Sequence, residues 1–180
     1  MLTKNTLNNQ NLSLYNLKII NELVYNKCGF NLTNLILNKE SVEYEACSFK
    51  LNEKVIQYRV SKITPTKTGQ FVAIWKRNKN GLTEPFNDLD DFDFIIITSK
   101  SENNFGQFIF PKSILVEKCI ITKKGKEGKR GIRVYPPWDI TTNKQAIKTQ
   151  NWQIKYFLDF SIKNKLDKQK LKALLNIEKQ

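Results

Sequence analysis

Histidine is absent from the 180-residue sequence, and its absence excludes several kinds of catalytic site. Without an imidazole, the sequence can form neither a Ser-His-Asp triad nor a Cys-His pair, nor a zinc site with histidine ligands. A GxxxxGK(S/T) phosphate loop and a GxGxxG motif after a predicted strand are missing as well. The sequence therefore lacks the common motifs for nucleophilic hydrolysis, nucleotide hydrolysis and dinucleotide binding.

Long apolar runs and paired cysteines are also missing. No stretch approaches the roughly 18 to 20 apolar residues of a membrane helix, and no apolar segment follows Lys4 as a secretory signal would require. Cys28, Cys47 and Cys119 are widely separated, which gives no metal-binding spacing and an odd number for disulfides. We therefore expect a soluble, cytoplasmic protein with reduced thiols and no membrane partner.

Positive charge, by contrast, is abundant. Lys and Arg number 30 against 17 Asp and Glu, and the net charge of +13 favours a polyanionic partner such as DNA or RNA. Most of these cations are Lys in a sequence rich in Asn and Ile, so the codon bias of a low-GC genome accounts for part of the excess. Their distribution is more informative: cations dominate residues 54–79 and 112–133, and an acidic run over 84–93 separates the two segments. Such segregation predicts that positive electrostatic potential is concentrated on one side of the protein rather than spread evenly.

Apolar periodicity predicts that the sequence opens with an amphipathic helix. Spacings of three and four residues place this helix over 12–27, with Asn11 as its N-terminal cap and Gly29 at its C-terminal end. The stripe expected to face the core consists of Leu12, Tyr15, Ile19 and Leu23, widened by Ile20 and Val24. A shorter helical piece is expected over 32–37.

The remaining elements predict one domain with a sheet in its middle. Alternating apolar residues and turn formers predict strands over 43–47, 55–62, 69–77, 92–98, 107–110 and 132–135. Further helices are predicted over 113–118, 143–160 and 167–177. The fold class is therefore α/β (α+β): a single domain, 1–180, with an N-terminal helical region (1–40), a sheet core (41–140) and C-terminal helices (141–178). A central mixed β-sheet flanked by helices is expected.

Two short segments resemble each other within the sequence. Gly69-Gln70-Phe71-Val72 and Gly106-Gln107-Phe108-Ile109 each open a predicted strand that ends in a cation. Three identical positions and one Val/Ile pair are consistent either with chance or with an internal duplication.

Several motifs give the sequence a resemblance to a known family. They are Tyr44-x-Ala46-x-x-Phe49, Lys62-x-Thr64-Pro65-x-Lys67-x-Gly69-Gln70-Phe71-Val72, Trp75-Lys76-Arg77, Gly106-Gln107-Phe108-x-Phe110-Pro111-Lys112 and Gly128-Lys129-Arg130-Gly131-x-Arg133-Val134-Tyr135-Pro136-x-Trp138-Asp139. In this order, across roughly residues 40–160, they resemble the MepB family of small bacterial proteins, encoded beside a multidrug efflux pump and its regulator. The resemblance implies a fold similar to the core of type II restriction endonucleases and a nucleic-acid-binding role.

Nucleases with that core place an Asp on one strand and a (D/E)-x-K motif on the next, and the two carboxylates hold Mg²⁺. Asp91 and Asp93 are candidates for the first carboxylate, and Glu45 for an additional ligand. The only (D/E)-x-K motif is Glu127-Gly128-Lys129, which falls in a glycine-rich loop rather than a strand. The strand after Asp93 offers Gln107, a poor ligand for a hard cation. No metal site is therefore predicted, and Mg²⁺ would be a cofactor only if the protein were a nuclease.

The basic segments instead suit phosphate binding. Glycines beside cations let the backbone approach a phosphate, and aromatic side chains offer surfaces on which bases stack. The residues predicted to bind nucleic acid are Lys62, Thr64, Lys67, Gln70, Lys76, Arg77, Lys112, Lys123, Lys124, Lys126, Lys129, Arg130, Arg133, Trp138 and Lys144. A solvated hairpin tip is the alternative interpretation of the glycine-rich loop.

Three hypotheses follow for the function. The first is a nucleic-acid-binding protein with low sequence specificity and without robust catalysis, because no base-reading motif is recognisable. The second is a Mg²⁺-dependent nuclease that uses Glu45, Asp91 or Asp93. The third is a binding module for a small anionic ligand or an acidic protein. The sequence decides neither between DNA and RNA nor on the oligomeric state.

Overall fold

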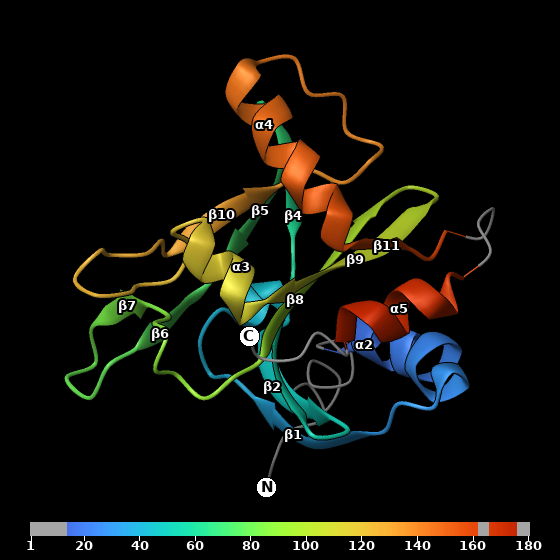
Figure 1. The fold of residues 1–180 in the computed structure, drawn as a ribbon, viewed down its shortest axis with the longest axis horizontal. Coiled ribbons are helices and arrows are strands. Elements are labelled where there is room, and N and C mark those ends of the chain that lie inside the picture. Colours follow the sequence, from blue (N-terminus) through green and yellow to red (C-terminus); the bar gives the residue numbers. More distant parts are fainter. Residues whose placement is uncertain (1–13, 162–165, 176–180) are drawn as a thin grey trace, which may run out of the picture.

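The computed structural model describes residues 14–161 and 166–175, which form one α+β domain around a mixed six-stranded sheet (Figure 1). Along the sheet the strands follow the order β1-β2-β3-β8-β9-β11. Their bounds are β1 (Leu32–Leu37), β2 (Cys47–Leu51), β3 (Lys54–Val60), β8 (Phe94–Ser101), β9 (Asn104–Pro111) and β11 (Phe157–Asp159). The sheet is mixed because β3 and β8 are parallel and every other neighbouring pair is antiparallel.

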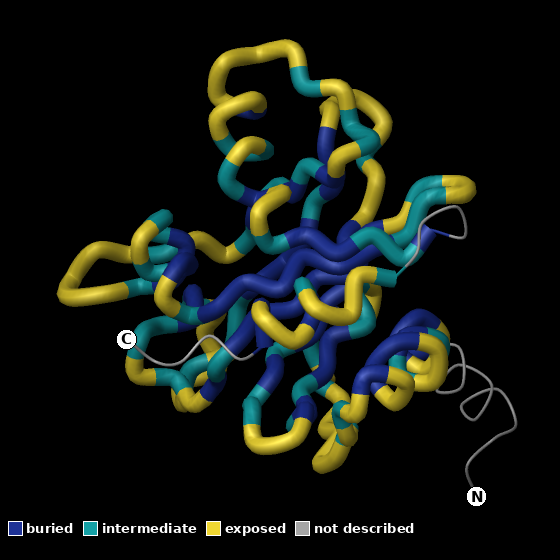
Figure 2. The backbone as a smooth tube through the Cα atoms, turned by 45° about the vertical axis from the view of Figure 1, so that its right-hand side comes forward, coloured by how far each residue is buried: buried dark blue, intermediate teal, exposed yellow. Residues whose placement is uncertain are grey.

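Both faces of this sheet are covered, which explains the apolar run of β8. Phe94 and Ile96 point to a core shared with α2 (Tyr15–Ile20) and α5 (Lys168–Leu175). Ile95 and Ile97 point to a second core, on the other face, shared with α3 (Lys112–Glu117) and a smaller sheet. Figure 2 shows the central strands buried along most of their length, with exposed residues in the loops and on the outer sides of the helices around them. Continuous apolar sequence is what a strand buried on both faces requires.

The smaller sheet brings the two basic segments together. It contains β10 (Gly131–Val134), β5 (Lys67–Ala73) and β4 (Lys62–Thr64), in that order, and the β6–β7 hairpin (Trp75–Arg77 and Thr83–Pro85) lies beyond β5 in the sequence. β10 is antiparallel to β5, and the sheet is covered on one side by α4 (Lys144–Gln153) (Figure 1). Segments 62–77 and 123–134 are therefore neighbours in the fold.

The first helix lies where the sequence predicts it, but with another face toward the core. Of the expected stripe, Tyr15 is 62% and Leu23 54% exposed, whereas the core side consists of Leu14, Leu17, Ile20, Val24 and Tyr25. Ile20 and Val24 of the expected stripe do face the core, but its placement of Tyr15 and Leu23 was wrong, because residues 15–28 offer two apolar faces and the backbone changes from α-helix to a π-helical turn over Asn21–Tyr25. Gly29 ends the segment with a φ of 80°, as expected. Leu12 and the predicted cap Asn11 lie outside the described residues.

Three other segments differ from the sequence-based expectation. Residues 32–37 form an edge strand rather than a helix, since their backbone pairs with β2 and their side chains are mostly exposed. Val42–Tyr44 is a 3-10 turn, and the strand expected from residue 43 begins at Cys47. The helix expected to reach residue 160 ends at Gln153, because Phe157–Asp159 pairs with β9 and completes the sheet. The six-stranded sheet thus extends on both sides of residues 41–140.

Two glycines explain the internal sequence echo. Gly69 has a φ of 84°, and a Cβ there would lie 2.6 Å from the ring of Tyr135. A Cβ on Gly106 would lie 2.3 Å from the ring of Phe157. In each case an aromatic ring from a neighbouring segment packs directly on the glycine backbone, and the following glutamine is buried. The two similar segments therefore share the same local packing.

Candidate nucleic-acid interface

A hollow of about 390 Å³, here called the α4 hollow, lies between α4, β10 and the end of α3. Its charged lining residues are Lys118, Lys129, Arg133 and Lys148, and none of the described residues that line it is acidic. Tyr135 and Trp152 add aromatic rings, and Gln145 and Thr149 add polar groups. The hollow therefore combines four cations with two aromatic side chains at the junction of three elements.

The position of α4 over β10 is fixed by one buried side chain. Gln153, 1% exposed, accepts a hydrogen bond from the backbone N–H of Tyr135 at 2.8 Å and donates one to the carbonyl of Arg133 at 3.0 Å. At the other end of the helix, the side chain of Asn143 caps α4 by accepting from the N–H of Ala146. These contacts hold the helix that carries Lys148 and Trp152 against the strand that carries Arg133.

Arg133 holds the β4–β5 turn in place. Its Nη1 donates to the carbonyl oxygens of Lys67, Thr68 and Gly69, and its Nη2 donates to Oγ1 of Thr64 at 2.9 Å. Such a fork of donors suits the planar guanidinium group and would not be reproduced by an ammonium. Arg133 therefore supports the hollow and contributes charge to its wall.

The more accessible positive charges of the α4 hollow are those of Lys118, Lys129 and Lys148. Lys118 lies 5.9 Å from the ring centroid of Trp152 and is also paired with Glu117 at 2.7 Å. Lys129 and Lys148 are exposed, and none of the ion pairs found within 14–161 and 166–175 involves them. These two ammonium groups are available to an incoming anion.

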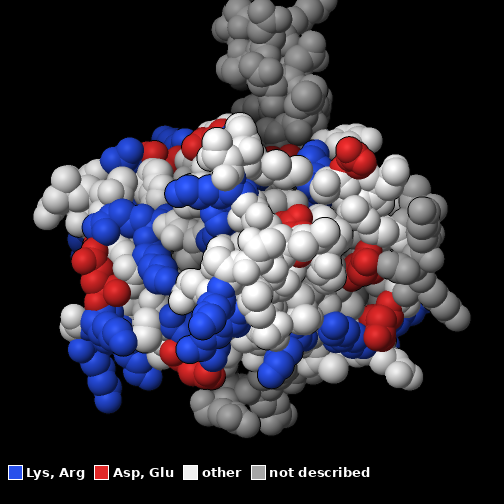
Figure 3. Space-filling view, turned by 90° about the horizontal axis from the view of Figure 1, so that it is seen from above, with Lys and Arg blue, Asp and Glu red and all other residues white. Residues whose placement is uncertain are grey.

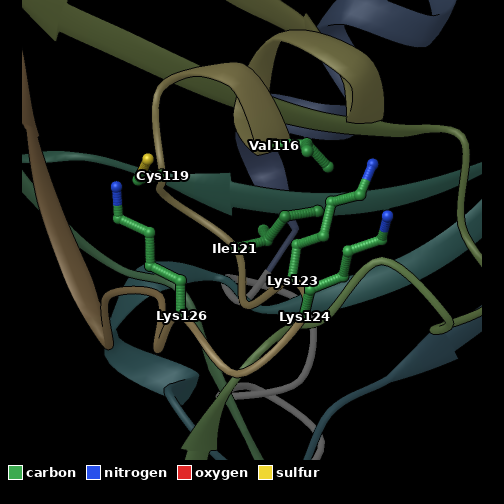
Figure 4. Close-up of a pocket in the computed structure, with 6 residues that line it drawn as sticks. All are labelled: Val116, Cys119, Ile121, Lys123, Lys124 and Lys126. Atoms are coloured by element: carbon green, nitrogen blue, oxygen red, sulfur yellow. The ribbon is translucent and has the colours of Figure 1, made fainter.

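A second, smaller hollow lies on the other side of the 118–121 connection. It has a volume of about 250 Å³ and is here called the turn hollow. Its lining residues are Val116, Cys119, Ile121, Lys123, Lys124 and Lys126 (Figure 4). Lys123, Lys124 and Lys126 belong to the basic loop predicted from sequence.

Four predicted binding cations have partners within the protein. Lys76 pairs with Glu84 and Asp90, Arg77 with Glu40, and Arg130 with Glu127. Lys112 donates to the backbone carbonyls of Asp88 and Asp90 and lies 4.6 Å from the ring centroid of Phe92. The acidic run over 84–93 therefore folds back on Lys76 and Lys112, and these two cations are less suited to an external phosphate.

The remaining predicted residues lie outside the two hollows. Gln70 is 1% exposed and accepts from Ser61, so it belongs to the interior. Trp138 packs edge-on against Phe157 at 5.4 Å. Thr64 is bound by Arg133, and Lys62 lies over the ring of Tyr44. Lys67, at the β4–β5 turn, and Lys144, at the start of α4, are exposed.

Of the lining residues of the α4 hollow, the predicted binding residues include only Lys129 and Arg133; those missed include Lys118, Gln145, Lys148 and Trp152. Lys148 and Trp152 stand four residues apart, a spacing that places both on one helix face. That spacing was the available signal, but a basic helix face is ordinarily only a solvated surface. This face differs from an ordinary solvated one because β10 lies beside it. The sequence pattern of α4 does not reveal that neighbour.

The candidate acidic residues do not converge. Asp93 accepts from the N–H of Val55 at the start of β3, whereas Glu45 lies two residues before Cys47, which pairs with Tyr58. Val55 and Tyr58 are three residues apart, or about 10 Å along a strand. Asp91 is exposed in the loop before β8. Within the described residues, no group of three or more Asp, Glu, Cys or His side chains is placed to hold a metal ion.

Gln107, which occupies the position where a second carboxylate was sought, belongs to a neutral buried network. Tyr25 donates its hydroxyl proton to Oε1 of Gln107 at 2.8 Å, and Nε2 of Gln107 donates to Oγ1 of Thr98 at 3.0 Å. The hydroxyl of Tyr58 lies 2.8 Å from the same Thr98 oxygen. All four side chains are fully buried. This network ties the first helix to β3, β8 and β9.

Charge is unevenly distributed over the face that carries α4. Viewed from above, Lys and Arg side chains gather over the left half of the molecule, the half that contains α3 and the 120–130 loop in Figure 1 (Figure 3). Asp and Glu on this view lie at the left, upper and lower margins of that half and on the right side. The two hollows are lined by residues of this same region.

The mixed sheet and its flanking helices define the chain as a single-domain α+β protein. A family model described as MepB-like matches residues 38–159, so the chain belongs to the MepB-like family. The chain is similar to a crystal structure of MepB, with 36% identity, a TM-score of 0.72, and coverage of 84% of this chain and 99% of that one. A bacterial homing endonuclease, I-Ssp6803I, is similar at 14% identity and a TM-score of 0.42, over 74% of this chain and 83% of its own. No curated protein matches the sequence.

Within the part of the chain that the structure covers, no helix is long and apolar enough to cross a membrane.

Proposed function

We propose that this protein binds nucleic acid at the α4 hollow, with low sequence specificity and without robust catalysis. The observation that carries the proposal is the acid-free lining of that hollow, in which four cations surround Tyr135 and Trp152. Cations neutralise backbone phosphates, and aromatic rings accept the faces of unpaired bases of any sequence. A hollow for a simple inorganic anion would need the charges but not the two rings.

Low specificity follows from the kind of groups available. Direct readout of a base pair uses a helix or ribbon that enters the major groove and presents several base-reading side chains. Gln145 and Thr149 are the uncharged amide and aliphatic hydroxyl side chains that the hollow offers to base edges, and Gln153 is already committed to the backbone of β10. Affinity would therefore come mainly from phosphates and stacking, with DNA and RNA both acceptable as ligands.

Catalysis receives no comparable support. Asp93 is engaged with the β3 backbone, Gln107 is held in a neutral network, and Glu45 stands apart from Asp93.

The location follows from the cysteines. The three cysteines within the described residues are free thiols, which agrees with a reducing compartment, so we also propose a cytoplasmic location.

A salt series tests the proposal. Fluorescently labelled single-stranded DNA, duplex DNA and RNA are titrated with the wild type and with the double variant Lys129→Ala/Lys148→Ala. The charge-matched control is Lys168→Ala/Lys172→Ala, which removes two exposed lysines of α5 on another side of the molecule. The slope of log K against log salt is expected to decrease by about 1.4 for single strands in the first variant, at ~0.7 per phosphate contact, and to stay unchanged in the control.

Two results would contradict the proposal. One is flat, weak binding of all three nucleic acids by the wild type at low salt. The other is an equal loss in both double variants, because only net charge would then matter. Binding of small anions without binding of nucleic acid would favour a receptor for a small anionic ligand instead.

A further inference from the structure

The turn hollow is a built feature rather than a gap between mobile lysines. Lys123 and Lys126 exchange backbone hydrogen bonds at 3.1 and 3.0 Å, and the two residues between them, Lys124 and Gly125, have φ values of 47° and 77°. Positive φ at both central residues is the geometry of a tight two-residue hairpin turn. The turn therefore holds three ammonium-bearing side chains around one apolar floor.

The floor and rim differ in chemistry. Ile121, 2% exposed, and Val116 provide aliphatic surface, and Cys119 adds a thiol at the edge. Figure 4 shows Ile121 in the middle, Lys123 and Lys124 extending to one side, and Lys126 and Cys119 on the other. No acidic residue is among the described residues that line this hollow. An apolar floor with a cationic rim suits a ligand that has a flat apolar part and a negative part.

The two hollows are separated by a thin ridge of backbone. Along the 118–121 connection the residues alternate: Lys118 and Ile120 line the α4 hollow, whereas Cys119 and Ile121 line the turn hollow. The returning chain lies directly against this connection, because the N–H of Lys129 donates to the carbonyl of Ile120 at 2.8 Å. Consecutive Cα atoms are about 3.8 Å apart, so the two linings meet within the span of a few residues.

From this arrangement we infer that the turn hollow is a second subsite for the same nucleic-acid strand. The strand that occupies the α4 hollow continues over the ridge at 120–121 and 128–129 and places a further nucleotide in the turn hollow. Its phosphate lies among Lys123, Lys124 and Lys126, and its base or sugar lies against Val116 and Ile121. This inference rests on the proposed function and adds to it the path that the strand follows from the α4 hollow to the turn hollow.

The chemistry of the second subsite also defines what it does not recognise. Apart from the thiol of Cys119, its side chains offer aliphatic surface and ammonium groups, and ammonium groups donate hydrogen bonds but do not accept them. A base of any identity satisfies this lining. The second subsite therefore lengthens the footprint of the strand without adding sequence specificity.

Cys119 provides a reporter in the unmodified protein. Cys28 is 7% and Cys47 0% exposed, whereas Cys119 is partly exposed at the edge of the turn hollow. N-Ethylmaleimide is expected to alkylate Cys119 first, and an oligonucleotide of roughly 12 nucleotides to slow that reaction. A dinucleotide, which fills one subsite, serves as the comparison ligand. Lys129→Ala/Lys148→Ala should lose this protection in parallel with its loss of affinity.

A second measurement removes the rim charges. The variant is Lys123→Gln/Lys124→Asn/Lys126→Gln, with Asn at position 124 because Asn tolerates the positive φ found there. Its control is Lys168→Gln/Lys170→Gln/Lys172→Gln on α5, which carries the same change in net charge. For the long oligonucleotide the salt slope should fall by about 0.7 in the turn variant, which is the contribution of the one phosphate contact that is lost. For the dinucleotide it should match that of the control.

The outcomes separate the two proposals. Suppose the long oligonucleotide binds in a manner that depends on Lys129 and Lys148, yet Cys119 reacts at the rate of the free protein and the turn variant keeps its slope. The second subsite would then be wrong and the proposed function would stand. If neither oligonucleotide binds in a salt-dependent manner, both proposals fail together.

Discussion

The buried network around Gln107 allows a quantitative prediction: substitutions in it should lower the stability of the fold without changing the affinity of the site for oligonucleotides. Gln107→Leu keeps the approximate size of the side chain but removes the acceptor for Tyr25 and the donor for Thr98. Thr98 retains the hydroxyl of Tyr58, whereas the hydroxyl of Tyr25 is left buried without a partner. An unsatisfied buried hydroxyl costs about 1 to 3 kcal/mol, so the free energy of unfolding should fall by at least that amount. Tyr25→Phe, which leaves Gln107 without its donor, should cost about 1 to 2 kcal/mol.

The double variant gives the decisive comparison. In Gln107→Leu/Tyr25→Phe both partners are replaced by apolar groups and little is left unsatisfied. The loss of unfolding free energy in this double variant should therefore be smaller than the sum of the two single losses by about 1 to 3 kcal/mol. Urea denaturation at neutral pH measures these free energies, and the slope of each transition should stay that of the wild type. Additivity within about 0.5 kcal/mol would refute the proposed coupling. Under conditions where each variant is folded, its affinity for oligonucleotides should equal that of the wild type. A loss of affinity would mean that Gln107 belongs to the binding site.

Two further predictions concern Glu45 and Arg133. Burial raises the pKa of Glu45, partly opposed by the hydrogen bond from Asn16, so this carboxyl group stabilises the fold below its unfolded pKa of about 4.3 and loses that contribution as the pH rises through the folded pKa. Glu45→Gln should therefore unfold at higher urea than the wild type at neutral pH, and the difference should shrink in acid; an equal difference at both pH values would contradict this reasoning. Arg133→Lys keeps the charge but loses the fork that binds the β4–β5 turn, which should cost about 1 to 3 kcal/mol of stability by urea denaturation, with a salt slope close to that of the wild type. A changed slope with unchanged stability would show that Arg133 contacts phosphate rather than the turn.

Parts of the fold could be predicted from local sequence because their environment is uniform along the element. The apolar run of β8 predicts a strand buried on both faces, and Gly29 predicts the end of the first helix. Segment 32–37 could not be assigned in this way, since its pairing with β2 is what makes it a strand. The same applies to Phe157–Asp159, which follows a helix directly and becomes a strand only because β9 offers an edge.

The site shows the same division. The basic loop over 123–131 was recognisable from composition, and the pairing of β10 with β5 places it beside the other basic segment. The partners of Lys76, Arg77 and Lys112 were not predictable, because each depends on a carboxylate or carbonyl brought close by tertiary structure. Lys148 and Trp152 were not recognised because their spacing is common on helices, and only the neighbouring strand β10 makes a hollow beside them.

The pairing of β10 with β5 joins residues far apart in the chain, since Arg133 lies opposite Phe71 and binds Thr64, 69 positions away. The walls of the α4 hollow exist only after this long-range closure has occurred, and closure of so large a loop carries an entropic cost that no short segment can meet alone. A ligand of the hollow must therefore bind the native state in preference to the unfolded chain and raise the melting temperature in proportion to the logarithm of its concentration. Isolated peptides from either basic segment would keep the charge but lack the shape.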